Sequence, residues 1–176
     1  MGSVLMDSKY ILNEEEYSYW ENNQTESISL KFNNNFARVV SGHQNTLTSS
    51  NLVLLGGLVL SGMVKEWESR ILAGKYNMYG ALRLDREVRA CLSGVQLGSW
   101  GSSDSEHGWN RGSIRDYFSR LTETCLVIGV EQVDEVLEVW GPRSGLIRWR
   151  LNASEVRKVL ACRVEFSQSQ ISDLVL

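Results

Sequence analysis

The apolar positions between residues 28 and 92 change their period twice, and this change predicts the order of the elements. In residues 28–32 the apolar side chains fall on even numbers, and Phe36 and Val40 keep the same parity further on, which is typical of a strand with one face on a core. Between residues 52 and 74 they recur every three or four positions, which favours a helix. From residue 76 to 92 the alternation returns, so the sequence predicts a strand, a long helix and a second long strand.

The long helix has recognisable signals at both ends. Ser49, Ser50 or Asn51 can cap its start, and Gly74 can end it in the left-handed conformation. We expect Leu55 and Trp67 to be among its most buried residues. Gly56-Gly57 lies in the middle of the helix and favours close packing against the sheet, since no Lys-Ser/Thr follows to make a phosphate loop.

The remaining elements are shorter. A short helix over Ile114–Leu121 begins near Ser113, and Asn152 to Glu155 is a capping-box variant that opens a second short helix with Val156, Val159 and Leu160. Strands are predicted at 125–130, 136–140, 146–151 and 162–166. The predicted fold class is α+β, with a mostly antiparallel sheet and one long and two short helices packed on it. The predicted organisation is an arm (1–27), one core domain (28–166) and a tail (167–176).

The charge distribution indicates a local basic surface on an acidic protein. The 176 residues are 43% hydrophobic and carry a formal net charge of −3, which is compatible with one core and excludes a polycation. The C-terminal third is nevertheless basic. We expect contacts with phosphates of lipid or RNA there, from Arg148, Arg150, Arg157, Lys158 and Arg163. The alternative is a solvated face balanced by Glu131, Asp134, Glu135 and Glu138.

The first 27 residues are acidic yet rich in aromatic side chains, which a freely disordered tail normally lacks. One interpretation is that this segment folds on its own core. The other is an arm that mediates self-association through side chains of the kind that anchor interfaces, namely Tyr10, Ile11, Leu12, Tyr17, Tyr19 and Trp20.

Residues 93–111 form a Gly- and Ser-rich stretch that predicts a long loop with two tryptophans. Tryptophan favours the headgroup region of a bilayer, and basic residues follow, so we expect a membrane contact through Trp100, Trp109, Arg111 and Arg115. The alternative is that both tryptophans fold back onto the sheet. The longest apolar run, 52–64, is shorter than the ~20 residues that span a bilayer, which predicts a soluble or peripheral protein.

The residues that could support catalysis are few. His107 lies near Asp104 and Glu106 in the long loop, but this spacing does not match a metal site. Cys125 lies inside an apolar run, where a thiolate is disfavoured. Cys91, Cys125 and Cys162 are widely spaced and are interpreted as buried small hydrophobes rather than as disulfides or zinc ligands. The sequence predicts no enzyme, no cofactor and no metal.

The order of elements resembles that of rhabdovirus matrix proteins, in particular the compact ones of plant cytorhabdoviruses. The resemblance is carried by the strand, the Trp-bearing helix, the Ala73-Gly74-Lys75 turn, the strand at 76–84, the aromatic helix Ile114–Leu121 and the late Arg157-Lys158 helix. It covers residues 28–166 by pattern, with few literal identities. Two departures are the acidic N-terminus and the single proline, Pro142, in place of a basic tail and a Pro-Pro-x-Tyr motif.

The resemblance implies a structural function. A viral matrix protein self-associates, condenses the nucleocapsid and links it to the inner face of the envelope for assembly and budding. The implied partners are further copies of the chain, the viral nucleoprotein–RNA complex, the anionic inner leaflet and the viral glycoprotein tail. The implied locations are the virion, the host cytoplasm and the cytoplasmic face of host membranes. Two alternatives are a small cytosolic enzyme centred on His107 and Cys125, and a monomeric adaptor or immunity protein.

Overall fold

The computed structural model describes residues 10–23, 28–97, 111–141 and 149–176, and this part of the chain is helical. Its elements are α1 (Glu14–Asn22), α2 (Ile28–Ser41), α3 (Ser49–Ala73), α4 (Met78–Leu97), α5 (Arg111–Ile128), α6 (Val136–Val139), α7 (Ala153–Leu160) and α8 (Gln168–Ser172). Within the described ranges, extended backbone pairs only at a parallel bridge between Tyr76 and Arg163. The predicted α+β fold with an antiparallel sheet is therefore wrong.

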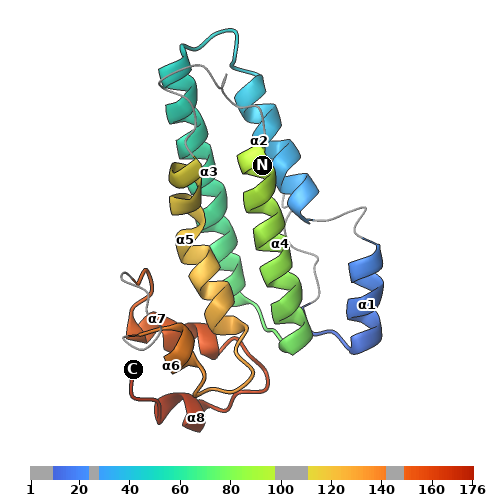
Figure 1. Cartoon of the computed structure of the whole chain (residues 1–176), viewed down its shortest axis with the longest axis vertical. Coiled ribbons are helices and arrows are strands. Elements are labelled where there is room, and N and C mark those ends of the chain that lie inside the picture. The colour runs from blue at the N-terminus through green and yellow to red at the C-terminus, as the bar shows by residue number, and fades with distance from the viewer. Residues whose placement is uncertain (1–9, 24–27, 98–110, 142–148) are drawn as a thin grey trace.

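The four longest helices form a bundle in which consecutive helices along the chain run in opposite directions (Figure 1). α2 contacts α3 and α4, and α5 contacts the same two helices, so the four close a ring around one core (Figure 1). The short helices α6, α7 and α8 gather at one end of the bundle, and α1 lies along the outside of α4 (Figure 1). Aromatic side chains from three bundle helices meet in the core: the Phe32 ring lies 5.7 Å from that of Trp67 and 5.9 Å from that of Phe118.

The segment predicted as the first strand is α2. Ile28, Phe32, Phe36 and Val40 are buried, and they are spaced four residues apart, which is a helical spacing as well as an even one. Leu30, which a strand would place on the same face, is 51% exposed. The even-number pattern therefore arose from one helix face plus one exposed leucine.

The second predicted strand, 76–92, is mostly α4, and the cause of the error is similar. Leu84 and Val88 satisfy both periods, but Ala81, Cys91 and Val95 complete a helical face of buried residues. Leu82, which a strand would place beside Leu84, is instead exposed on the helix surface.

The long helix predicted from residues 52–74 is confirmed as α3, with differences at its ends. The N-cap is Thr48, whose side chain accepts a hydrogen bond from the backbone N–H of Asn51. Gly74 is in an extended conformation with φ −86°, so the predicted left-handed end is wrong. Trp67 is 2% exposed, as expected, whereas Leu55 is only partly buried.

The C-terminal predictions are confirmed for helices and wrong for strands. The helix predicted at Ile114–Leu121 is longer and continues through the apolar run at 125–128, whose residues form the last turns of α5. Residues 136–139 are also helical. Of the predicted strand at 146–151, residues 146–148 lie outside the described residues, and in 162–166 only Arg163 makes a bridge.

The predicted capping box at the start of α7 is confirmed. The Asn152 side chain accepts from the Glu155 N–H, and the Glu155 carboxylate accepts from the Asn152 N–H, at 3.0 and 2.9 Å. Val156, Val159 and Leu160 are buried as expected.

Two glycines permit close approaches that position neighbouring segments. A Cβ at Gly57 would lie 2.6 Å from the Tyr117 hydroxyl oxygen, so the predicted close packing of α3 occurs against α5 rather than a sheet. A Cβ at Gly80 would overlap the backbone carbonyl of Tyr10, so the N-terminal segment crosses α4 at that position.

Candidate interaction surfaces around the base of the bundle

An ion-paired junction, formed by Glu68, Arg120, Glu123, Arg150 and Glu155, joins the bundle to the C-terminal helices. The Arg120 guanidinium donates to Glu68 of α3 at 2.6 Å and to both carboxylate oxygens of Glu155 of α7, at 2.7 and 3.3 Å. It also donates to the backbone carbonyl of Arg150 at 2.8 Å. This paired guanidinium, with the Asn152 N–H, lowers the pKa of Glu155. One side chain on α5 therefore holds α3 and α7 together.

Glu123 lies one helical turn further along α5 and fixes the chain that enters α7. One carboxylate oxygen accepts from the backbone N–H groups of Arg150 and Leu151, at 2.7 and 3.1 Å. The other oxygen is buried without a hydrogen-bond partner. Burial raises the pKa of Glu123, and the two backbone donors oppose this rise.

A second contact fastens the end of α5 to the C-terminal segment. Arg163 is 3% exposed, and its guanidinium donates to the carbonyl oxygens of Ile128 and Val130, the first of which lies in the last turn of α5. Its Nε pairs with Glu165 at 3.0 Å. The residues on either side of Arg163 in the chain, Cys162 and Val164, exchange backbone hydrogen bonds with Tyr76, both at 2.9 Å.

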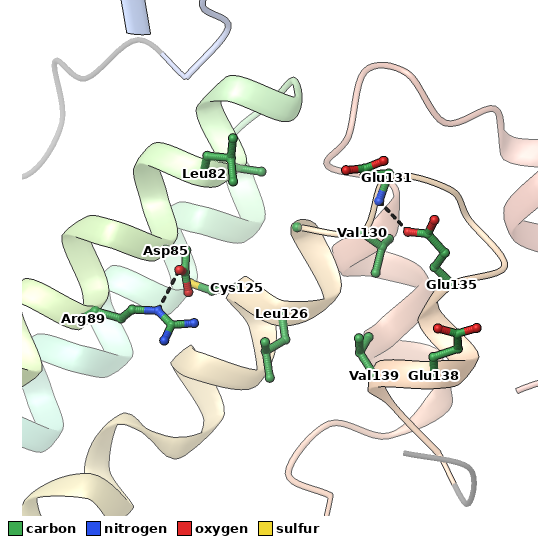
Figure 2. A pocket seen from close by; sticks show the side chains of 12 residues that line it. Leu82, Asp85, Arg89, Cys125, Leu126, Val130, Glu131, Glu135, Glu138 and Val139 are labelled. Carbon is green, nitrogen blue, oxygen red and sulfur yellow. Dashed lines mark hydrogen bonds and ion pairs between the residues drawn. The ribbon is translucent and has the colours of Figure 1, made fainter. Parts of the chain in front are cut away.

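A pocket of 540 Å³ opens between α4, the end of α5 and α6 (Figure 2). Its apolar lining includes Leu82 from α4, Leu126 from α5 and Val139 from α6. Its charged lining consists of Asp85, Arg89, Glu131, Glu135 and Glu138, and the Arg89 guanidinium pairs with Asp85 at 2.7 Å. Four carboxylates against one guanidinium give the lining a formal charge of −3.

The residues predicted to mediate self-association lie in α1 and in the segment before it, and three of them contact side chains of α4. The Tyr10 hydroxyl donates to the buried Glu87 carboxylate at 2.6 Å, and Asn77 exchanges hydrogen bonds with the backbone of Leu12. Tyr17 is buried beside Tyr79, with ring centroids 5.6 Å apart, and Arg83 lies over the ring of the partly buried Trp20. Ile11 and Tyr19 are exposed. Self-association through these side chains stays a prediction.

The residues predicted to contact phosphates do not share one surface. Lys158 and Arg150 are exposed, the latter 3.6 Å from Asp116, while Arg157 donates to the carbonyl of Leu174. Arg163 is buried and donates to the carbonyl oxygens of Ile128 and Val130, as described above. Arg148 lies outside the described residues, so phosphate contact by this group stays a prediction.

The predicted membrane-contact residues are only partly described. Trp100 and Trp109 lie outside the described residues, Arg111 is the first residue of α5, and Arg115 is exposed on that helix. In the part of the chain that the structure covers, no helix is both long and apolar enough to cross a bilayer.

The described residues offer little for catalysis. All three cysteines are free and buried, as predicted, and burial raises the pKa of each thiol. Cys125 therefore lacks the thiolate character of a nucleophile, and His107, its proposed partner, lies outside the described residues. Among the residues that the structure places, no three His, Cys, Asp or Glu side chains gather as a metal site.

Reasoning from sequence missed the Arg120 junction and the acidic pocket. From the sequence, Glu131, Glu135 and Glu138 are expected only to balance the charge of a basic sheet face. A signal was present for the junction: Arg120 lies four residues after Asp116 and three before Glu123 in a helical segment, but its partners Glu68 and Glu155 are 52 and 35 residues away. Such distant pairs become visible only once the helices are packed.

Comparisons with known proteins give a consistent family. The family model described as "Conserved oligomeric Golgi complex subunit 4, C-terminal" matches residues 1–158. The chain is similar to the conserved oligomeric Golgi complex subunit 4 of Arabidopsis thaliana, with 35% identity over 76% of the chain, and of Homo sapiens, with 35% over 69%. The subunit 4 of Bos taurus is 30% identical over 99% of the chain.

The chain spans a small part of these relatives, namely 16%, 14% and 20% of their respective lengths. The matches overturn the resemblance to rhabdovirus matrix proteins, which depended on predicted strands at positions that the described residues form as helices. The same matches overturn the viral matrix function, the nucleoprotein–RNA and glycoprotein partners and the virion location. The relatives also give no support to an enzyme centred on His107 and Cys125 or to an immunity protein.

Proposed function

Because the chain belongs to the family of conserved oligomeric Golgi complex subunit 4 C-terminal regions, we propose that it is a helical interaction module of such a subunit. In this role it contributes protein–protein contacts to the complex and acts with it in vesicle tethering at the Golgi, without catalysing a reaction. The observation that carries the proposal is the family match over residues 1–158.

The structure supports a scaffold role on physical grounds. The bundle is a packed body, and ion pairs at its base set the position of α7 relative to α3 and α5. Rigid elements of this kind hold surface side chains in a fixed arrangement, which reduces the entropy lost when a partner binds. The raised pKa values of the buried cysteines disfavour thiolate chemistry.

The proposal is tested by isolating the polypeptide that carries this chain, with an affinity tag, from its own cells. We expect the other subunits of the conserved oligomeric Golgi complex to co-purify with it, and the tagged protein to colocalise with a Golgi marker. The control is the same tag on an unrelated helical bundle. Purification of the tagged protein without those subunits, or a distribution that matches the control, contradicts the proposal.

A further inference from the structure

We propose that the pocket between α4, α5 and α6 is a docking groove for an amphipathic helix of a partner protein, with apolar residues on one face and Lys or Arg along its edges. The inference rests on the proposed function and names the kind of partner that one surface of the module takes. It follows from an apolar floor, an acidic rim and the net negative charge of the chain itself.

The floor of the groove includes leucine side chains that remain more than a third exposed. Leu82 is 39% exposed and Leu126 is 36% exposed, although both lie on helices whose opposite faces are fully packed. Val130 and Val139 add to the apolar lining (Figure 2). Apolar side chains at the meeting point of three helices form the kind of surface on which an amphipathic helix lays its own apolar face.

The rim is acidic and partly fixed in place. The Glu135 carboxylate accepts from the backbone N–H groups of Glu131 and Gln132, at 2.9 and 3.2 Å, which holds it beside the groove. Arg89 is paired with Asp85, so the charges of Glu131, Glu135 and Glu138 are not offset by another lining side chain (Figure 2). A negative rim favours a cationic partner and repels an anionic membrane surface.

A second copy of this chain is a poor occupant. The exposed leucine pair of α3, Leu54 and Leu58, lies in a segment, residues 49–64, that contains no Lys or Arg. The whole chain is also acidic, with a net charge of −3. Charge complementarity therefore selects a basic helix from another protein.

The test uses the whole chain and a labelled peptide of about 14 residues, or four helical turns, with Leu on one face and Lys on the other. The control peptide carries Glu in place of Lys. Fluorescence anisotropy should show binding of the Lys peptide only. The double variant Glu131→Lys plus Glu138→Lys should bind about tenfold more weakly, as expected when two favourable charge pairs become repulsive.

Two further variants separate groove binding from general attraction to an acidic protein. The double variant Glu15→Lys plus Asp173→Lys has the same net charge but alters exposed positions that do not line the groove, and it should bind as the wild type does. Leu126→Gln should weaken binding without adding charge. Circular dichroism melts of all variants exclude unfolding as the cause of a loss.

Several outcomes overturn the inference. They are no binding of the Lys peptide, equal weakening by the two charge-reversed variants, and full binding by Leu126→Gln. Sedimentation that shows dimers lost on Leu126→Gln would identify a second copy as the occupant. Tighter peptide binding after Arg143 and Arg148 are replaced by Ser would identify residues 142–148 of the chain itself. A failed peptide test with intact co-purification of the Golgi subunits would reject the groove and leave the proposed function standing.

Discussion

Trp67 is the largest fully buried side chain of the core, and its removal should be the most damaging single truncation in α3. We expect Trp67→Ala to lower the free energy of unfolding by about 3–5 kcal/mol, because the cavity left among Phe32 and its neighbours adds to the lost transfer energy. Urea unfolding followed by circular dichroism measures the loss. Leu55→Ala, at a partly buried position of the same helix, should cost clearly less. A loss below about 1 kcal/mol for Trp67→Ala would mean that the core does not depend on this ring.

Glu87 gives the stability of the protein a distinct pH dependence. Burial raises its pKa above the ordinary 4.5, while the Tyr10 hydroxyl and the Arg83 guanidinium partly oppose the rise. A carboxyl group with a raised folded-state pKa contributes stability below 4.5 that is lost as pH rises through the folded-state pKa.

We therefore expect Glu87→Gln, which cannot ionise, to lose less stability than the wild type as pH rises from about 4.5 towards neutrality. Urea unfolding of both proteins across this range gives the difference. Glu15→Gln, on the exposed face of α1, is the control and should follow the wild type. Parallel pH profiles for wild type and Glu87→Gln would show that the carboxyl group titrates as it does in water.

At the scale of elements, Gly80 permits the crossing of the N-terminal segment over α4. We expect Gly80→Ala to displace residues 10–13, since the new methyl group would overlap the Tyr10 carbonyl, and to cost about 1–3 kcal/mol, as overpacking does. Hydrogen exchange of the α1 amides should become faster. Gly62→Ala, where no atom lies within 4 Å of the added Cβ, should instead stabilise α3 by up to about 1 kcal/mol. Unchanged α1 exchange in Gly80→Ala would contradict the crossing.

The attachment of α7 to the bundle depends on Arg120. Arg120→Ala should lower the free energy of unfolding by about 1–2 kcal/mol, because it removes paired, charge-assisted hydrogen bonds and leaves Glu68 and Glu155 without their cation. Urea unfolding provides the measurement, with Arg89→Ala as the control. That arginine makes an exposed pair with Asp85 on one helix, which is worth less than about 0.5 kcal/mol. Equal losses for the two variants would show that the junction does not organise α7.

Where the sequence contained an unambiguous element signal, the prediction held. α3 has apolar residues at both three- and four-residue steps over more than six turns, and the capping box of α7 needs only residues 152 and 155. α2 and α4 failed because a four-residue step is also an even step, so buried residues at 28, 32, 36 and 40 fit both periods. The exposed leucines Leu30 and Leu82 also occupy even-numbered positions, so the apolar pattern favoured a strand.

At the scale of the whole molecule, the order of predicted elements gave a false resemblance because two of the long elements were assigned wrongly. The three buried cysteines were predictable from their apolar surroundings. The acidic pocket was not, because Leu82, Leu126 and Glu138 come together only through the packing of α4, α5 and α6. Predicting such a surface requires the packing of the bundle, which depends on contacts between residues that are far apart in the chain.

The bridge between Tyr76 and Arg163 has a consequence for the rate at which the chain folds and unfolds. Neighbouring helices such as α2 and α3 meet after a short connection closes, whereas this contact closes a loop of about half of the chain, at a larger cost in loop entropy. We expect the bundle to form before the rate-limiting barrier and the bridge after it. Arg163→Met removes the side-chain hydrogen bonds to Ile128 and Val130 that hold the bridged segment against α5. In stopped-flow measurements this variant should then speed unfolding and leave the refolding rate nearly unchanged, while Val40→Ala in the bundle should slow refolding. Slower refolding of Arg163→Met would place this contact in the nucleus, and the middle of the chain and its C-terminal part would then have to meet first.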